Sequence, residues 1–210
     1  MASISDRRLE EIRGWYYKDY LSLKDVADKV GVSIDSVVYF MRRHGLKRRT
    51  LIEARRLRFE RKPLSFSIFH RLNARDRSLQ VIGAMLYWCE GFKGNETSTN
   101  STVDLANSDP KMISLFLNFL RRIYRIDEKR LRVLLYCYSD QDIPRLKAFW
   151  SGITGIPLSQ FSKPYVRNDF RTDGRKMKHG MVHVRYSDKK LLIELKNLID
   201  SVCGKYAPVA

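Results

Sequence analysis

A carboxylate closes the most apolar segment of the chain. Residues 79–89 are apolar at nearly every position, and Glu90 and Gly91 follow directly. An acid in the last turn of a helix lies at the negative end of the helix dipole, which is unfavourable by about 0.3–1 kcal/mol. A cation beside Glu90 would offset this charge, so Glu90 is a candidate ligand of a divalent metal ion. An exposed Glu90 that merely follows a buried helix, capped by Gly91, is the alternative.

Positive charge is the second feature that indicates chemistry. The 210 residues include 40 Lys+Arg and 23 Asp+Glu, a net charge of +17, and a folded chain this basic usually binds a polyanion. Residues 42–62 hold ten basic residues and two glutamates, and residues 167–178 hold five basic and two acidic residues. We expect nucleic acid as the partner, with an anionic membrane surface as the alternative.

Several other classes of protein fit the sequence poorly. The longest uninterrupted apolar run, 81–89, is far shorter than the ~20 residues that span a bilayer, and the N-terminus lacks an apolar signal core. Three widely spaced cysteines favour neither a disulfide framework nor a zinc knuckle, so we expect a reducing, cytoplasmic location. His179 and His183 lack a nearby cysteine, which favours structural or DNA-facing histidines over a zinc site. The sequence has no Walker loop or other nucleotide-cofactor motif.

The first 50 residues predict a small helical domain. Apolar residues recur with helical spacing over 6–20. Ser22 opens a capping box for a second helix that ends at Gly31. Ser33 begins a third helix, which ends at Gly45. Two helices joined by a three-residue turn, the second bearing basic residues, resemble a DNA-binding helix-turn-helix.

Packing of these helices leaves one face of the third helix for DNA. Ala27 is small enough for two helices to cross closely, and Val37 and Phe40 would hold the third helix onto the second. A solvated face on a three-helix packing unit is the alternative to DNA binding. The basic run beyond the third helix supports phosphate contact. The candidate DNA-binding residues in this part of the chain are Ser36, Tyr39, Arg42, Arg43, Lys47, Arg48, Arg49, Arg55 and Arg56.

The rest of the chain alternates between helical and strand patterns. Strands are expected over 102–106, 131–138, 158–166 and 181–186, and helices over 79–91, 110–123, 143–150 and 188–203. We expect the helix over 79–89 to be buried on all sides. We also expect most of five large aromatic residues to be buried, namely most of Trp88, Phe116, Phe119, Phe149 and Trp150. The fold class is therefore α+β, divided into a helical domain (1–50), a basic linker (51–76) and an α+β domain (77–210).

This order of elements, over about 79–202, resembles the LAGLIDADG fold. The segment that lies over its nine-residue motif is Gly83-Ala84-Met85-Leu86-Tyr87-Trp88-Cys89-Glu90-Gly91. Glu90 falls where the family places its acidic metal ligand, and Gly91 falls where the helix must end. Ala84 and Cys89 match positions at which small residues let two motif helices approach closely. Met85 departs from the pattern, since the family favours glycine there.

The resemblance implies a homodimer that packs through the helix 79–91 and binds double-stranded DNA with an antiparallel, saddle-shaped sheet. Glu90 of each protomer, with Gly91 beside it, would hold Mg²⁺ or another divalent cation. For the basic catalytic partner we suggest Lys163, with Lys93 second, although plain phosphate contact explains either lysine. Gln160 is a candidate for ordering water. The further DNA-contact candidates are Lys93, Arg132, Tyr136, Tyr138, Arg167, Arg171, Arg175, Lys176, Lys178 and Arg185.

Three functions remain open on the sequence alone. The first is a site-specific, Mg²⁺-dependent DNA endonuclease of the homing type. The second is a non-catalytic DNA-binding transcriptional regulator with the same fold, which the departure at Met85 and the unassigned basic partner favour. The third is a recombination or branched-DNA factor.

Overall fold

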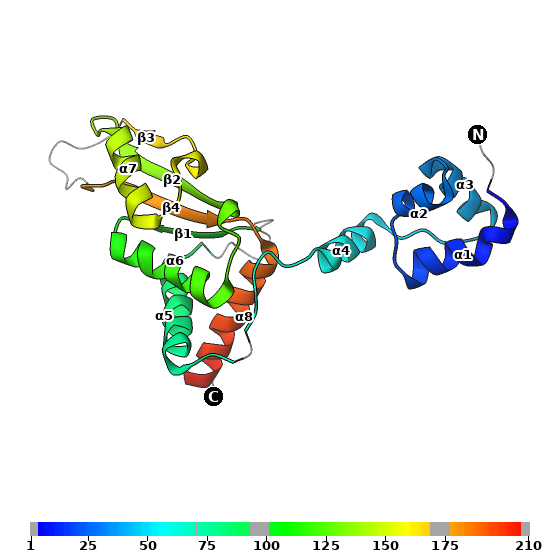
Figure 1. Cartoon of the computed structure of the whole chain (residues 1–210), viewed down its shortest axis with the longest axis horizontal. Helices are drawn as coiled ribbons and strands as arrows, with labels where there is room; N and C mark the ends of the chain where they lie inside the picture. The colour runs from blue at the N-terminus through cyan, green and yellow to red at the C-terminus, as the bar shows by residue number, and fades with distance from the viewer. Residues whose placement is uncertain (1–3, 70, 93–100, 169–176, 207–210) are drawn as a thin grey trace. The chain divides into compact units, whose positions relative to one another are not determined.

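In a computed structural model, the chain divides into two compact units with separate cores, Met1–Pro63 (unit 1) and Leu64–Ala210 (unit 2) (Figure 1). The structure describes residues 4–69, 71–92, 101–168 and 177–206. The segment expected to be a linker, 51–76, instead begins with a helix, α4 (Leu51–Arg61), and the division between the units follows Pro63. In the described ranges, no helix is both long and apolar enough to cross a membrane.

Unit 1 is helical. Before α4 it contains α1 (Leu9–Arg13), α2 (Leu23–Val30) and α3 (Ile34–Arg43). The helix predicted over 6–20 is divided, because a 3₁₀ turn (Asp6–Arg8) precedes α1 and a π-helical turn (Gly14–Lys18) follows it. Tyr20, with a φ of 54°, then changes the direction of the chain.

The ends of α2 and α3 form where the sequence predicts them. The Ser22 hydroxyl accepts a hydrogen bond from the Asp25 backbone N–H (3.1 Å), and the Asp25 carboxylate accepts one from the Ser22 N–H (2.9 Å). Gly31 adopts a φ of +76° that side chains disfavour, and it ends α2. The Ser33 hydroxyl accepts from the Ser36 N–H (3.2 Å) and begins α3. The chain thus passes from α2 to α3 in three residues.

The predicted packing residues of unit 1 are buried. Ala27, Val37 and Phe40 belong to its core, together with Ile12 and Tyr16 of the first helical segment. These contacts hold α3 against α2, as expected. They also fix which face of α3 remains outside the core.

Unit 2 contains a four-stranded sheet in the order β1-β4-β2-β3. The strands are β1 (Val103–Asn107), β2 (Leu131–Tyr138), β3 (Tyr165–Arg167) and β4 (Met181–Tyr186). β4 pairs antiparallel with β1 and β2, but β3 pairs parallel with β2, so the sheet is mixed and the prediction of an antiparallel sheet is wrong at β3. A helix, α7 (Ile143–Thr154), lies between β2 and β3 in the chain, and such a crossover permits parallel pairing.

The strand predicted over 158–166 is also largely absent. Leu158–Gln160 form a 3₁₀ turn, and Phe161 makes only an isolated parallel bridge with Val133. Regular pairing is confined to the three residues of β3. Pro157 and Pro164, which lack a backbone N–H, flank the turn and the bridge.

Helices cover one face of the sheet. α5 (Ala74–Glu90), α6 (Pro110–Tyr124), α7 and α8 (Lys189–Tyr206) share one apolar core with alternate residues of β1, β2 and β4 (Figure 1). In β2 the core residues are Leu131, Val133, Leu135 and Cys137. The intervening residues of each strand therefore point to the opposite face, which we call the open face.

The helix predicted to be buried on all sides is buried on one side only. Leu79, Gly83 and Tyr87 of α5 face the core, whereas Ile82 and Trp88 are 49% and 46% exposed. Of the five aromatic residues that were expected to be mostly buried, Phe116, Phe119 and Trp150 are fully buried and Phe149 is half-buried, but Trp88 is exposed. An apolar sequence on every side of a helix therefore does not show which sides the rest of the chain buries.

Small residues in α5 serve packing within unit 2. A Cβ atom on Gly83 would lie 2.1 Å from the Phe119 ring of α6, so only glycine fits there. Ala84, which the family resemblance places between two motif helices, is fully buried in the core of its own protomer. Only Cys89 of the two matched small residues is exposed.

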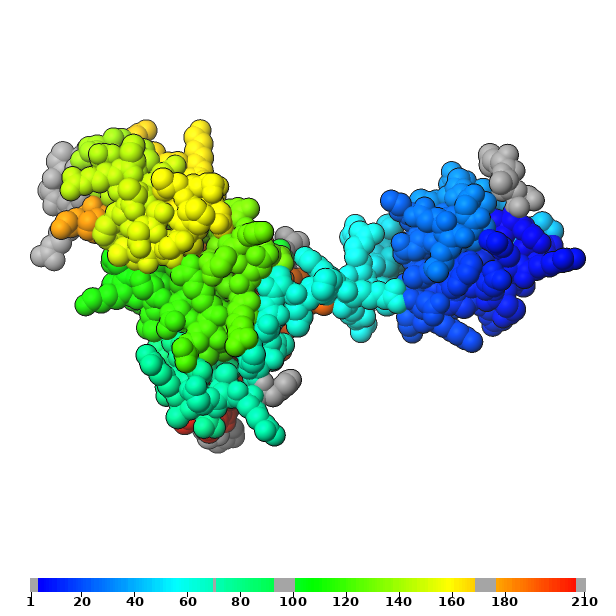
Figure 2. Space-filling view, in the orientation of Figure 1, coloured from blue at the N-terminus to red at the C-terminus, as the bar shows by residue number. Residues whose placement is uncertain are grey.

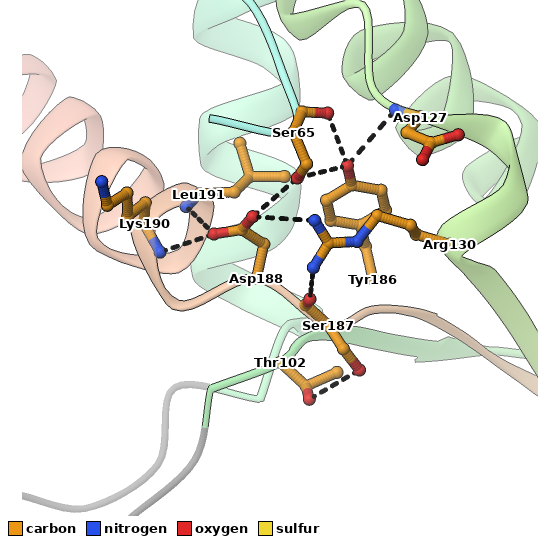
Figure 3. Close-up of polar contacts among 9 residues, drawn as sticks. All are labelled: Ser65, Thr102, Asp127, Arg130, Tyr186, Ser187, Asp188, Lys190 and Leu191. Carbon is orange, nitrogen blue, oxygen red and sulfur yellow. Dashed lines mark hydrogen bonds and ion pairs between the residues drawn. The ribbon is translucent and has the colours of Figure 1, made fainter. Parts of the chain in front are cut away.

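A buried polar network ties the start of unit 2 to the sheet (Figure 3). The Asp188 carboxylate accepts hydrogen bonds from the Ser65 hydroxyl (2.6 Å) and from the backbone N–H groups of Lys190 (2.8 Å) and Leu191 (3.3 Å), and pairs with Arg130 (3.3 Å). Burial of Asp188 raises its pKa, but these hydrogen bonds and the Arg130 charge outweigh burial and hold the pKa below its ordinary value. The network joins the chain before α5 to the start of α8.

Candidate nucleic-acid interface

The outer face of α3 carries aromatic and basic side chains. Tyr39 is 60% exposed, and the Arg42 guanidinium lies 5.6 Å from the centre of its ring. Arg43 pairs with Asp6 (3.3 Å), so its charge is partly neutralised. The Ser36 hydroxyl lies 2.9 Å from that of Ser33 and belongs to the cap of α3. Tyr39 and Arg42 are thus the best placed of the predicted contacts on α3.

Arg49 has a structural role that the sequence did not indicate. Its guanidinium stacks on the Tyr16 ring (3.9 Å) and donates hydrogen bonds to the backbone carbonyls of Tyr16 (3.0 Å), Tyr20 (3.2 Å) and Leu21. These contacts hold the chain after α3 against the end of the first helical segment. Arg49 was predicted to contact DNA, but its donors are largely used within unit 1.

A basic crevice of about 790 Å³ lies in unit 1 between α4 and the start of α2. Its lining includes Lys24, Arg48, Arg58 and Lys62. Lys47 and Arg55 are exposed nearby in the sequence, and Arg56 pairs with Glu60 (2.8 Å). The predicted basic run therefore forms one exposed, positively charged region of unit 1.

The open face of the sheet gathers the predicted strand residues. Arg132 and Arg185 are register partners on β2 and β4, and Tyr136 and Tyr138 follow along β2 on the same face. Arg167 is the register partner of Tyr138 on β3. The expectation that these residues share one face follows the alternation of buried and open positions.

An ion-pair network lies at one end of the open face. Asp104 of β1 contacts His183 (Oδ1 to Nδ1, 2.9 Å) and accepts a hydrogen bond from Nε of Arg185 (2.8 Å). Burial of the Asp104 carboxyl raises its pKa, but the hydrogen bonds and charges of His183 and Arg185 outweigh burial and lower the pKa overall. Asp104 therefore stays ionised and neutralises part of the positive charge of this face.

The structure shows different amounts of detail for the remaining contacts of the basic candidates. Arg132 donates to the backbone carbonyls of Lys129 (2.7 Å) and Leu131 (2.6 Å). Lys178 is exposed just before β4. The candidates Lys93, Arg171, Arg175 and Lys176 lie outside the described residues.

Glu90 is exposed at the end of α5. The Asn107 side-chain amide lies 3.4 Å from its carboxylate. Gly91 pairs antiparallel with Leu105 of β1, and a Cβ atom on Gly91 would lie 2.3 Å from the Tyr87 ring, so glycine is required where the helix ends. The arrangement offers one exposed carboxylate per chain, beside a side-chain amide.

Within the chain, the structure does not bring Gln160 or Lys163 to Glu90. A continuous register row runs from Gly91 across β1, β4 and β2 to Phe161. At about 4.8 Å per strand, the row spans roughly 19 Å. Gln160 and Lys163 flank Phe161 at the far end. The Gln160 amide donates to the carbonyls of Glu128 (2.8 Å) and Leu131 (2.7 Å), which accounts for it structurally.

The sequence did not single out Tyr165, and it did not place His183 beside Tyr136. Tyr165 lies on a three-residue strand without clear alternation, and it meets Tyr136 only through the parallel pairing. His179, by contrast, stacks on Phe149 of α7 (3.8 Å). A polar residue between valines in β4 was the available signal that His183 faces away from the core.

Compared with protein-family models, curated proteins and solved structures, the chain matches none of them.

Proposed function

We propose that the chain is a site-specific double-stranded DNA-binding protein that acts as a homodimer and cleaves DNA with a divalent metal ion, as LAGLIDADG endonucleases do. The observation that carries the proposal is the apolar stripe of α5 on which Ile82, Trp88 and Cys89 are exposed and Met85 is half-buried, and which ends one residue before Glu90. Exposed apolar stripes of this kind mark interaction surfaces. A two-fold axis along the stripe would bring both Glu90 carboxylates to one end of the dimer.

Unit 1 would supply sequence recognition. The order of α2, a three-residue turn and α3 supports a helix-turn-helix, with α3 as the helix that enters the major groove. Tyr39 and Arg42 would contact base edges or phosphates, and the basic residues around α4 would contact phosphates. A symmetric dimer predicts a pseudo-palindromic binding site.

The residues around Glu90 fit a hard divalent cation. Mg²⁺ prefers oxygen ligands and is typically bound through one or two carboxylates plus phosphate oxygens. One exposed Glu90 per protomer, with the carbonyl of Gly91 next in sequence, would provide such oxygens in a dimer. The Asn107 amide turns its nitrogen toward Glu90, and its oxygen accepts a hydrogen bond from the Asp109 N–H (2.8 Å), so it would position Glu90 and would not bind the metal. When bound, the metal would activate water and stabilise the leaving oxygen of a phosphodiester.

Cleavage assays test the enzymatic part. Wild type and Glu90→Gln are incubated with a library of DNA targets in Mg²⁺, and Glu11→Gln, an exposed glutamate of α1, is the matched control. We expect cleavage by wild type and Glu11→Gln and its loss in Glu90→Gln, with DNA binding retained. Equal cleavage by all three proteins would remove Glu90 from the proposal.

Oxidative cross-linking tests the dimer. Cys89 is exposed in the last turn of α5, and a disulfide requires Cα atoms about 4.4–6.8 Å apart. We expect a Cys89–Cys89 cross-link in a Cys203→Ser background and a monomer by sedimentation after Trp88→Glu. A Trp88→Glu protein that remains dimeric would contradict pairing through this stripe.

A non-catalytic DNA-binding regulator is the second candidate. It is favoured by the positions of Gln160 and Lys163 near Phe161, at the far end of the register row, which leave Glu90 without either of them in its own protomer. Site-specific binding that is unaffected by EDTA, without nicking of the bound DNA, would support this candidate over the endonuclease.

A further inference from the structure

Three rings form a row across the open face of the sheet. Tyr136 of β2 lies between Tyr165 of β3 and His183 of β4, and both pairs of ring centres are 4.8 Å apart. The rings are tilted by 35° and 31° relative to Tyr136. Tyr136 is the register partner of Tyr165 on β3, and His183 lies two residues from Met181, the register partner of Tyr136 on β4. The pairing of the strands therefore places the three rings side by side.

The inner end of this aromatic row is fixed. His183 contacts the Asp104 carboxylate (2.9 Å), which also accepts a hydrogen bond from Arg185 (2.8 Å). The Asp104 and His183 side chains are only 13% and 19% exposed. A ring platform held in this way loses little conformational entropy when a ligand stacks on it.

The outer end of the row is open. Tyr165 is 54% exposed, and all three residues of β3, at the edge of the described sheet, are exposed. The yellow segment that carries β3 lies at the surface of unit 2 in Figure 2. A planar ligand can therefore extend the row by stacking on Tyr165.

The charge around the row is suited to phosphate. Arg132 and Arg185 are register partners on the same face, where Asp104 is the one acid among the described strand residues. Arg185 uses Nε toward Asp104, and a guanidinium carries four further N–H groups. Aromatic rings with arginines on an open sheet face are typical of surfaces that stack unpaired bases and contact the backbone. Bases in a duplex stack on each other, so their flat faces are not available.

We propose that this aromatic row binds unpaired nucleobases of single-stranded nucleic acid by stacking, with Tyr165 as the first platform. The inference rests on the proposed nucleic-acid binding and names a ligand that duplex recognition does not require. Stacking is tolerant of base identity, and the row has no feature that reads the sugar, so single-stranded DNA and RNA should bind alike.

Fluorescence anisotropy with the full chain tests the proposal. The probes are labelled dT₁₂, rU₁₂ and a DNA duplex of the same length, at one fixed salt concentration. We expect Tyr165→Ala to weaken binding of both single strands about tenfold, within the range for one stacked base, and to leave duplex binding unchanged. Tyr165→Phe keeps the ring and should bind within about twofold of wild type. Tyr206→Ala, an exposed tyrosine of α8, is the matched control.

Different failures have different meanings. Tyr165→Leu keeps apolar bulk on β3 without an aromatic face, so a folded Tyr165→Leu protein with wild-type affinity for dT₁₂ would overturn the proposal. Equal losses for single strands and duplex in Tyr165→Ala would also overturn it, as would duplex binding without any single-strand binding. A chain that binds none of the three probes would refute the proposed function as well.

Discussion

Substitution of Asp188 should destabilise unit 2 strongly. The carboxylate is 4% exposed and has four partners, the hydroxyl of Ser65, two backbone N–H groups at the start of α8, and Arg130. Loss of a helix cap is worth about 1 kcal/mol, and loss of the Ser65 bond and of the charged partner about 1 kcal/mol each. Because Arg130 is partly exposed, water replaces some of its lost contact. We expect Asp188→Ala to reduce the free energy of unfolding of unit 2 by about 3 kcal/mol.

Denaturant and thermal unfolding measure this change. For a unit of roughly 150 residues, 3 kcal/mol lowers the Tm by about 10 °C. Asp200→Ala, an exposed acid on the same helix, should change the free energy of unfolding by less than about 0.5 kcal/mol. A loss below about 1 kcal/mol in Asp188→Ala would show that the network in Figure 3 contributes little and would refute the reasoning.

The same network predicts a pH dependence with a definite sign. The pKa of Asp188 is held below its ordinary value of 3.8 in the folded chain, so the folded state favours the ionised form. Its contribution is present above the unfolded pKa and is lost as pH falls through the lower folded pKa. The stability difference between wild type and Asp188→Asn should be constant from pH 7 to pH 5 and should shrink below about pH 4. A difference that grows with acidification would contradict this assignment.

Four further substitutions separate structural from binding roles. Gly83→Ala should destabilise unit 2 by about 2 kcal/mol or more in denaturant unfolding, because its Cβ would overlap the Phe119 ring; wild-type stability would contradict the close packing of α5 on α6. Arg49→Ala should destabilise unit 1 by about 2 kcal/mol through lost hydrogen bonds and stacking. Arg48→Ala, in contrast, should leave the stability of unit 1 unchanged. It should reduce the slope of log affinity for DNA against log salt concentration by about 0.9. The reverse pattern would exchange their roles. Asp104→Asn removes the one acid of the network on the open face, so DNA affinity measured by anisotropy should rise and its salt slope steepen; weaker binding would show that Asp104 mainly positions the face.

Local signals in the sequence predicted the helix ends well. Ser22 and Ser33 are N-caps in the structure, and Gly31 ends α2 in the left-handed conformation. Each of these features depends on hydrogen bonds within about four residues, which the sequence displays directly. The alternation of residues in β2 likewise predicted its core and open faces.

Pairing between distant strands could not be predicted in the same way. The contact between Asp104 and His183 joins residues 79 positions apart, and it depends on the register of β1 with β4. β3 is too short to display a period of two, so neither its parallel direction nor the position of Tyr165 beside Tyr136 was visible. The sequence therefore predicted part of the candidate site on the open face. Arg132, Tyr136 and Arg185 were expected there, but the row of rings that joins Tyr136 to Tyr165 and His183 was not.

The position of Trp88 explains why the apolar run 79–89 was misinterpreted. A helix that is apolar on all sides is either buried by its own chain or lies between its own core and another molecule. Leu79, Gly83 and Tyr87 repeat every four residues toward the core, and Ile82 and Trp88 lie on a second stripe that the described residues leave half exposed. In the sequence, the core-facing and the exposed apolar residues form one continuous run. Only the fold shows which residues belong to which side. A second copy of the same stripe is a self-complementary cover for such a surface, and it would place the two Glu90 carboxylates together at the end of α5. Each Glu90 carboxylate is unfavourable at the negative end of its own helix dipole, and in the dimer it would also repel the second Glu90 carboxylate. A cation shared by the two carboxylates would offset both interactions.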